Sequence, residues 1–129
     1  MYTCNRENMT KLVEALESEE YTQTTGQLRS EYGFCCLGVA CDISGLGEWT
    51  LENGIYFYND GEGDFDCSTL PHGVIEQLGL NANEAQFTEQ LPLTTDGNFD
   101  TGSDMNDNGF AFADIAAEIR KAYLEGNDQ

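Results

Sequence analysis

Apolar residues recur at helical spacing near both ends of the chain. The first run predicts an amphipathic helix over residues 5–19, with Asn5 as a suitable N-cap. Its apolar positions follow the order i, i+3, i+4 and i+7: Met9, Leu12, Val13 and Leu16. A second run from Phe112 to Tyr123 predicts a C-terminal helix, because the 3.6-residue spacing returns there and basic residues occupy its last turns.

Short stretches of strand-like pattern lie between these helices. Residues 48–52 and 55–58 alternate around Asn53-Gly54, the dipeptide most typical of a tight hairpin, so we expect two antiparallel strands there. The stretch 21–34 is rich in Thr and Tyr and contains Gly26 and Gly33. It predicts two short strands, or an extended arm with a turn.

Two further segments complete the pattern. "TLPHGVIEQLGL", residues 69–80, predicts a short helix, because Pro71 suits a first helical turn and Gly79 suits a helix end. "TTDGNFDTGSDMNDNG", residues 94–109, has no apolar periodicity and predicts a long polar loop.

Three of the five cysteines lie in "FCCLGVACD", residues 34–42. The segment is apolar on nearly every side, so it predicts a buried central helix at about 35–44 in which Cys35, Cys36 and Cys41 serve as small hydrophobic residues. Gly38 offers a place for close approach by another element. Five is an odd number and the chain shows no export signal, so disulfides are not expected.

Two sharper interpretations of the cysteines stay open. A zinc site could use Cys36 and Cys41, although their spacing is neither C-x2-C nor C-x3-C. The remaining ligands would come from the other cysteines or the single histidine: Cys4, Cys35, Cys67 and His72. A nucleophilic cysteine paired with His72 is also conceivable, but the sequence gives no geometry for it. We therefore predict no catalytic residues.

A partial calcium-loop template begins at Asp104, where "DMNDNG" fits the opening D-x-[DN]-x-[DN]-G and a helix is expected to follow. The twelfth position is Ile115 instead of the required glutamate, and Asp114 falls one place early. We therefore interpret the stretch as a turn that caps the last helix. We predict no bound metal and no cofactor.

The length of 129 residues suits one domain, and 40% hydrophobic residues are enough for a folded core. Together the pattern predicts a small single α+β domain over 1–129, with terminal amphipathic helices, a buried Cys-rich helix and a short antiparallel hairpin or sheet. No apolar run approaches the ~18 residues of a membrane span, and the first residues lack the apolar core of a secretory signal. We expect a cytoplasmic protein.

Charge is the most unusual global property. The chain carries 5 Lys and Arg against 24 Asp and Glu, a formal net charge of −19. No Lys or Arg occurs from Ser30 to Ile119, since the basic residues are confined to the two ends of the chain: Arg6, Lys11, Arg29, Arg120 and Lys121. Direct binding to nucleic acid or to an anionic membrane is not expected, because phosphate contacts need cations.

The order of segments resembles a group of small, mostly uncharacterised proteins of tailed bacteriophages. The resemblance covers nearly the whole chain, and its most specific piece is "FCCLGVACD". The closing "MNDNGFAFADIAAEI" is similar to that group's Leu-Asn-Asp-x-Gly-x-Ser-Phe-x-x-Ile-Ala pattern, with Met105 in the Leu position and Ala111 in the Ser position. The resemblance implies action inside a host cell and supplies no catalytic residues.

We therefore expect a non-enzymatic acidic protein that binds and inhibits a host nucleic-acid-binding or defence protein, as a DNA mimic. The partner would present a basic surface to carboxylates of the central segment. The predicted partner-binding residues are acidic clusters in and after the hairpin and in the polar stretch: Asp60, Glu62, Asp64, Asp66, Asp96, Asp100, Asp104 and Asp107. Two alternatives stay open: a haloadapted phage structural or accessory protein, and a protein that sequesters a small ligand near the Cys-rich helix.

Overall fold

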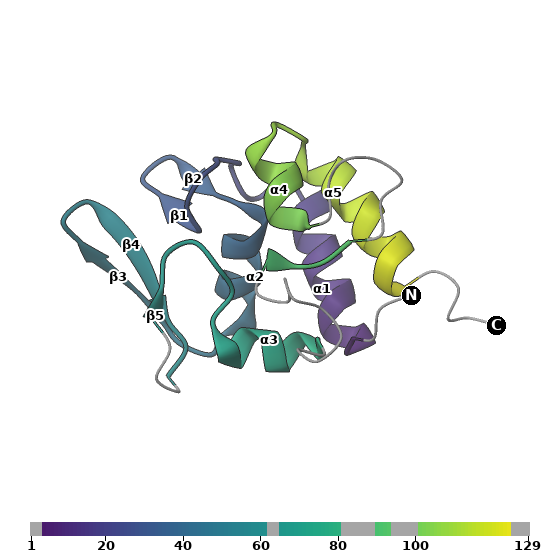
Figure 1. Ribbon diagram of the computed structural model, residues 1–129, viewed down its shortest axis with the longest axis horizontal. Coiled ribbons are helices and arrows are strands. Elements are labelled where there is room, and N and C mark those ends of the chain that lie inside the picture. Colours follow the sequence, from purple (N-terminus) through teal and green to yellow (C-terminus); the bar gives the residue numbers. More distant parts are fainter. Residues whose placement is uncertain (1–3, 62–64, 81–89, 94–100, 125–129) are drawn as a thin grey trace.

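A computed structural model gives the fold and describes residues 4–61, 65–80, 90–93 and 101–124, without the side chains of 65 and 66. Helices gather at one end of the molecule and the β-strands project from the other (Figure 1), so the predicted α+β class is confirmed. The elements follow in this order: α1 Arg6–Glu17, β1 Arg29–Ser30, β2 Gly33–Phe34, α2 Cys36–Ser44, β3 Glu48–Glu52, β4 Ile55–Asn59, β5 Phe65–Asp66, α3 His72–Leu78, α4 Gly102–Asp107, α5 Phe112–Ile119 and the π-helical turn η2 Arg120–Leu124.

Helix α1 confirms the predicted N-terminal helix and its cap. The Asn5 side chain accepts a hydrogen bond from the Asn8 backbone N–H at 3.0 Å. The four predicted apolar positions are all buried, and α1 packs against α2, α3, α5 and η2. The Asn5 N–H also donates to the Leu78 carbonyl at 2.7 Å, so the start of α1 is fixed against the end of α3.

Helix α2 lies at the centre of the fold and contacts α1, α3, α4 and β2. Cys35, Cys36 and Cys41 are buried, as the apolar pattern predicts. Gly38 permits a close approach, because a Cβ there would collide with the Leu28 carbonyl oxygen. The Leu28 carbonyl also accepts from the Cys35 N–H at 3.0 Å. The chain segment before β1 therefore lies directly on α2.

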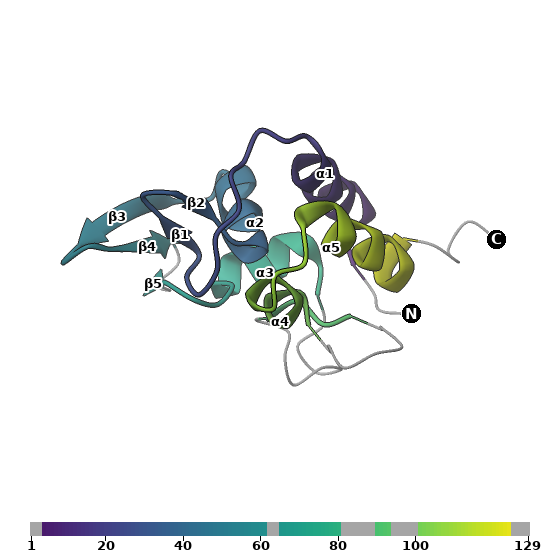
Figure 2. The ribbon, with the colours of Figure 1, turned by 90° about the horizontal axis from the view of Figure 1, so that it is seen from above.

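Strands β3 and β4 form the predicted antiparallel hairpin, and β5 pairs with the C-terminal end of β4. The turn residues Asn53 and Gly54 both have positive φ, 53° and 82°, as a two-residue hairpin turn of the primed type requires. Strands β1 and β2 form a second, smaller hairpin. Seen from above, both hairpins extend away from the helices (Figure 2).

The predicted helices at 69–80 and 112–123 are also present. Helix α3 follows Pro71 and ends at Gly79, whose φ of 75° suits a left-handed C-cap. Helix α5 continues into the π-helical turn η2, which buries the side chains of Ala122, Tyr123 and Leu124. The Tyr123 hydroxyl donates to the Pro92 carbonyl at 2.6 Å.

The predicted long polar loop at 94–109 is wrong for its second half. Residues 102–107 form helix α4, whereas 94–100 lie outside the described residues. Thr101 caps α4, because its hydroxyl oxygen accepts from the Asp104 N–H at 3.0 Å. Tertiary packing also stabilises α4, because the side chains of Met105 and the polar Asn106 are buried. A six-residue helix with one apolar side chain has no periodicity to read.

Asn106 joins three parts of the fold through its buried carboxamide. Its Oδ1 accepts from the Cys36 N–H at 3.2 Å and from Gln23 Nε2 at 2.9 Å, and its Nδ2 donates to the Thr24 carbonyl at 2.7 Å. Gln23 also accepts from the Phe112 N–H at 3.1 Å through Oε1. The first turns of α2 and α5 therefore depend on amide side chains held around α4.

Replacing Asn106 by alanine should lower the free energy of unfolding by ~2–3 kcal/mol, because the substitution leaves several buried polar partners unsatisfied. Urea unfolding followed by circular dichroism measures this loss. The matched control is Asn108→Ala: Asn108 is exposed, and its side chain donates only to the Asp104 carbonyl. That change should cost ~0.5 kcal/mol or less. Equal losses in the two variants would contradict the central role of Asn106.

Candidate functional site

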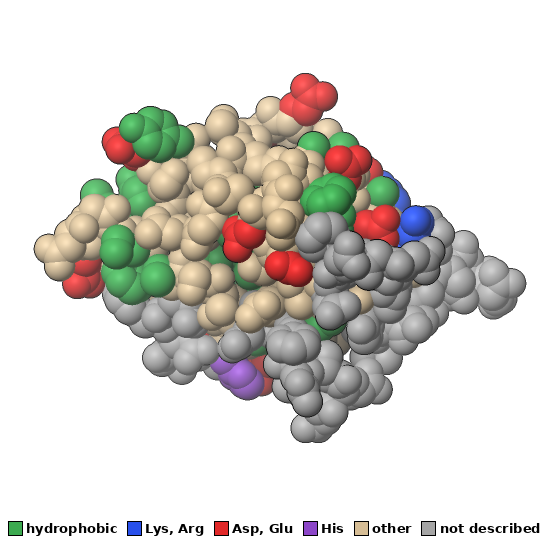
Figure 3. All heavy atoms as spheres, turned by 45° about the horizontal axis from the view of Figure 1, so that its top comes forward, with side chains coloured by type: hydrophobic (Ala, Val, Ile, Leu, Met, Phe, Trp, Pro, Cys, Tyr) green, Lys and Arg blue, Asp and Glu red, His purple; other side chains and the backbone are tan. Residues whose placement is uncertain are grey.

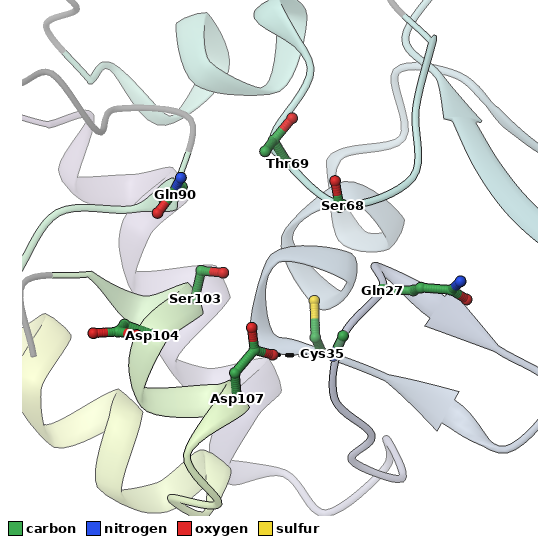
Figure 4. A pocket seen from close by; sticks show the side chains of 9 residues that line it. Gln27, Cys35, Ser68, Thr69, Gln90, Ser103, Asp104 and Asp107 are labelled. Atoms are coloured by element: carbon green, nitrogen blue, oxygen red, sulfur yellow. Dashed lines mark hydrogen bonds between the residues drawn. The ribbon is translucent and has the colours of Figure 1, made fainter.

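A polar cleft of about 270 Å³ opens where α4 faces the first turn of α2 and the loop that follows β5 (Figure 4). The segments that meet there are far apart in sequence. The Asn106 side chain holds α4 against α2 and Thr24, and the Leu28 N–H, which donates to the Cys67 carbonyl at 2.7 Å, holds the loop after β5. The lining residues are Gly26, Gln27, Cys35, Ser68, Thr69, Gln90, Ser103, Asp104 and Asp107. Hydroxyls, carboxamides and carboxylates dominate this list, so the cleft suits a polar or cationic group better than an apolar one.

Two of the predicted acidic residues lie at this cleft. Asp104 and Asp107 are separated by about one turn of α4 and are both exposed. Asp107 points across the cleft and accepts from the Gly26 N–H at 3.0 Å, whereas the Asp104 carboxylate lies toward the outer side of α4 (Figure 4). Within the residues that the structure describes, no Lys or Arg lines the cleft. The site therefore carries an uncompensated negative charge.

The Cys35 thiol points into the same cleft from the N-cap position of α2 (Figure 4). Its side chain is only 6% exposed. Burial raises the pKa of Cys35 to about 11, and the nearby Asp107 charge acts in the same direction. The Gly38 and Leu37 backbone N–H groups oppose this increase only in part. At neutral pH the thiol is therefore protonated, which is unfavourable for a nucleophile.

The single histidine is not part of this constellation. His72 is exposed on α3, where its Nε2 lies 3.0 Å from Glu76 Oε2, and it does not line the cleft. The structure describes all five cysteines, and none of them is in a disulfide. Among the described parts of the chain, no group of three His, Cys, Asp or Glu residues is placed to hold a metal ion. The calcium-loop template is not adopted at residues 104–107, which are α-helical.

Asp60 is a correction to the predicted acidic surface. It is 2% exposed, and its Oδ2 accepts from the Gly73 N–H at 2.8 Å, at the start of α3. A Cβ on Gly73 would lie within 3.0 Å of the Asp60 carboxylate, so the two residues fit closely. Asp60 therefore fixes the end of β4 to α3 and is not available to a partner. Asp60 begins an acidic stretch of the sequence, so the pattern predicts an exposed side chain there.

The other predicted residues have no described side chains. Asp66 is in β5, and its backbone pairs with Tyr58. Glu62, Asp64, Asp96 and Asp100 lie outside the described residues. Of the eight predicted positions, the structure thus brings Asp104 and Asp107 together and removes Asp60 from the surface.

The structure describes all five basic residues, and the side chain of each contacts another residue of the chain. Three form ion pairs in or between α1, α5 and η2, at N–O distances of 2.8 to 3.8 Å: Lys11 with Glu7, Arg120 with Glu17, and Lys121 with Glu118. Arg6 donates to the Leu124 carbonyl at 2.9 Å. Acidic side chains are distributed over the face seen in Figure 3, whereas the basic side chains visible on that face lie at its helical end.

Arg29 is the one basic residue near the strands, and it is held by aromatic rings. Its guanidinium carbon lies 5.1 Å from the ring centroid of Phe34, 5.4 Å from that of Trp49 and 4.5 Å from that of Tyr56. Asp42 supports the same cluster, because it accepts from Trp49 Nε1 at 3.0 Å. No local sequence pattern predicts this cluster, because its members are spread from position 29 to 56.

A family model described as a domain of unknown function (DUF8296) matches residues 4–123, and the chain belongs to that family. Neither a curated protein nor a solved structure is similar enough to count as a match. Across the described residues, no helix combines the length and apolar character needed to cross a bilayer.

The raised pKa of Cys35 predicts the pH dependence of its modification. In a Cys4→Ser, Cys67→Ser variant, labelling of the native protein by a thiol reagent should be slow at pH 7. Its rate should keep rising by up to ~10-fold per pH unit to about pH 10, because only the thiolate reacts. The unfolded variant should label rapidly and level off at lower pH. A native rate that levels off below pH 8 would contradict the assignment.

Proposed function

We propose that this chain is a non-catalytic, anionic protein-binding domain that occupies the basic, nucleic-acid-binding surface of a host protein and blocks it, as a DNA mimic does. One observation carries the proposal. All five Lys and Arg side chains contact other parts of the chain, and exposed carboxylates of α4 and of the strand lobe have no Lys or Arg within ion-pair distance among the described residues. We define the strand lobe as the two hairpins, β1–β2 and β3–β4, with the turn of each; helix α2 is not part of it.

The separation of charge is local as well as global. Glu7, Glu17 and Glu118 are compensated by basic residues of the terminal helices. A second set of carboxylates is exposed and, among the described residues, has no Lys or Arg within ion-pair distance: Glu31, Glu48, Glu52, Asp104 and Asp107. Because all five basic residues are described, no other side chain of the chain could neutralise this set.

An uncompensated surface of this kind favours one class of partner. Duplex DNA carries one negative charge per ~1.7 Å of its axis, and proteins that bind it present clustered Lys and Arg. Carboxylates on a folded domain can attract the same cations and accelerate association over long distances. The cleft beside Asp107 adds a recess in which a Lys or Arg side chain of the partner could lie.

The chemistry of the cleft supports a binding role over a catalytic one. Its thiol is protonated at neutral pH, and the histidine that could activate it is on α3, hydrogen-bonded to Glu76. The resemblance to proteins of tailed phages supports a host protein as the target. Direct binding to nucleic acid or to anionic lipid is opposed by the net charge of −19.

A matched pair of charge variants tests the proposal. Asp104→Asn with Asp107→Asn removes two charges at the cleft, whereas Glu14→Gln with Glu20→Gln removes two exposed charges on and after α1. The tagged parent should capture a basic host protein from lysate at ~50 mM salt and release it at ~0.5 M salt or on addition of duplex DNA. The cleft variant should bind that protein ~10-fold more weakly, and the α1 variant less than ~2-fold.

Two results would contradict this function. The first is that no protein captured at low salt is displaced by duplex DNA. The second is equal weakening by the two variants, which would show that only total charge matters. Haloadaptation predicts a different salt response: the isolated domain would lose its circular dichroism signal at low salt and regain it at high salt, because high salt screens the self-repulsion.

A further inference from the structure

The two large hydrophobic side chains that are exposed in the described part of the chain lie at one hollow. Tyr32 is 73% exposed and Leu51 is 56% exposed. Both line a recess of about 240 Å³ between the β1–β2 turn and the β3–β4 hairpin, together with Ser30, Glu31, Gly54 and Tyr56. Hydrophobic side chains gather at this strand end of the molecule in Figure 3. We call this recess the lobe hollow.

The apolar face of the hairpin leads into the lobe hollow. Leu51 pairs with Tyr56 across the two strands, and Trp49 pairs with Tyr58 one step nearer the core. Side chains two residues apart share a face of a strand, so these two pairs form one continuous surface. Tyr58 is 1% exposed and Leu51 is 56% exposed. The face therefore runs from the core out into solvent.

The two hairpins that line the lobe hollow are held together by aromatic and cation contacts beside it. The Trp49 ring lies 4.9 Å from the Tyr58 ring and 5.9 Å from the Phe34 ring, both edge to face. Arg29 lies over Tyr56 at 4.5 Å and links the smaller hairpin to the larger one. The two walls of the hollow are therefore fixed relative to each other before any partner arrives, which lowers the entropic cost of binding.

The charge around the hollow selects the occupant. Glu31 lines it, whereas the exposed Glu48 and Glu52 of β3 alternate with Trp49 and Leu51 and so lie on the opposite face of the hairpin. A second copy of this chain would also carry a net charge of −19, so self-association is opposed electrostatically. A basic protein segment meets both conditions, because a Lys or Arg of the segment can face Glu31 while an apolar side chain enters the hollow.

We propose that the lobe hollow is the docking site for an apolar side chain, leucine or aromatic, that is flanked by Lys or Arg on the partner protein. This inference rests on the proposed function and adds a specific anchor to its general charge attraction. Tyrosine and leucine beside a preformed recess supply the apolar contact that distinguishes one basic protein from another. Such anchors carry a large share of the energy in protein interfaces.

Two synthetic 12-residue peptides with the same number of Lys and Arg residues test the anchor. One has Leu-Trp at its centre and the other has Gly-Ser. Binding to the full chain is measured by calorimetry at low salt. The parent should bind the Leu-Trp peptide ~5- to 10-fold more tightly, because the hollow buries an apolar side chain that the Gly-Ser peptide lacks.

Variants of the hollow locate this preference. Tyr32→Ala with Leu51→Ser should abolish it while leaving affinity for the Gly-Ser peptide within ~2-fold, because the substitutions remove apolar surface and no charge. Both residues are exposed, so the fold should persist, and the circular dichroism spectrum checks this. Ile55→Ala is the matched control. It lies beside Leu51's partner Tyr56 in β4 but faces the opposite side of the hairpin, and should keep the preference.

The outcomes separate this inference from the proposed function. If the parent binds both peptides equally, the lobe hollow is not an anchor site, while attraction to basic proteins remains. If it binds neither, the charge-based function fails as well. Sedimentation of the parent addresses the other occupant: a dimer that Leu51→Ser dissociates would assign the hollow to a second copy and overturn the inference. A monomer supports the basic partner.

Discussion

The buried carboxamide of Asn106 is the contact on which the arrangement of this protein depends. It binds the first N–H of α2 and the Thr24 carbonyl of the segment between α1 and β1, which we call the arm, and so fixes α4 against both. Its sequence neighbour Asp107 therefore faces Gly26 of the arm, and Cys35, next to Cys36, faces the same space. This one satisfied amide thus positions two sides of the cleft, α4 and the first turn of α2. A buried polar hub of this kind is costly unless every partner is present.

Charge is organised around this scaffold in a simple way. The terminal helices compensate one another through Arg120 with Glu17 and through Arg6 with the Leu124 carbonyl. Arg29 is held over aromatic rings in the strand lobe. These contacts stabilise the ends of the chain locally and leave Glu31, Glu48, Glu52, Asp104 and Asp107 without a Lys or Arg within ion-pair distance among the described residues. The self-repulsion of those carboxylates destabilises the free domain, and a basic partner would relieve it.

Elements with strong local signals could be predicted from the sequence, whereas elements made by tertiary contacts could not. The apolar spacing of α1, the Asn53-Gly54 turn and the continuous apolar run of α2 each encode their structure within a few residues. Helix α4 depends on a cap and on burial of a polar side chain, neither of which has an apolar pattern. Asp60 shows the same limit for the site, because its burial depends on Gly73, thirteen positions away.

The most direct test of the account is carboxylate footprinting of the complex with the captured partner. A carbodiimide labels exposed Asp and Glu in the free protein and in the complex, and mass spectrometry compares each site. The account predicts protection of Glu31 and of Asp104 with Asp107, while Glu14 and Glu20 label equally in both states. Protection confined to Glu14 and Glu20, with Glu31, Asp104 and Asp107 still labelled, would contradict the claim that the carboxylates of α4 and of the strand lobe are the ones that bind.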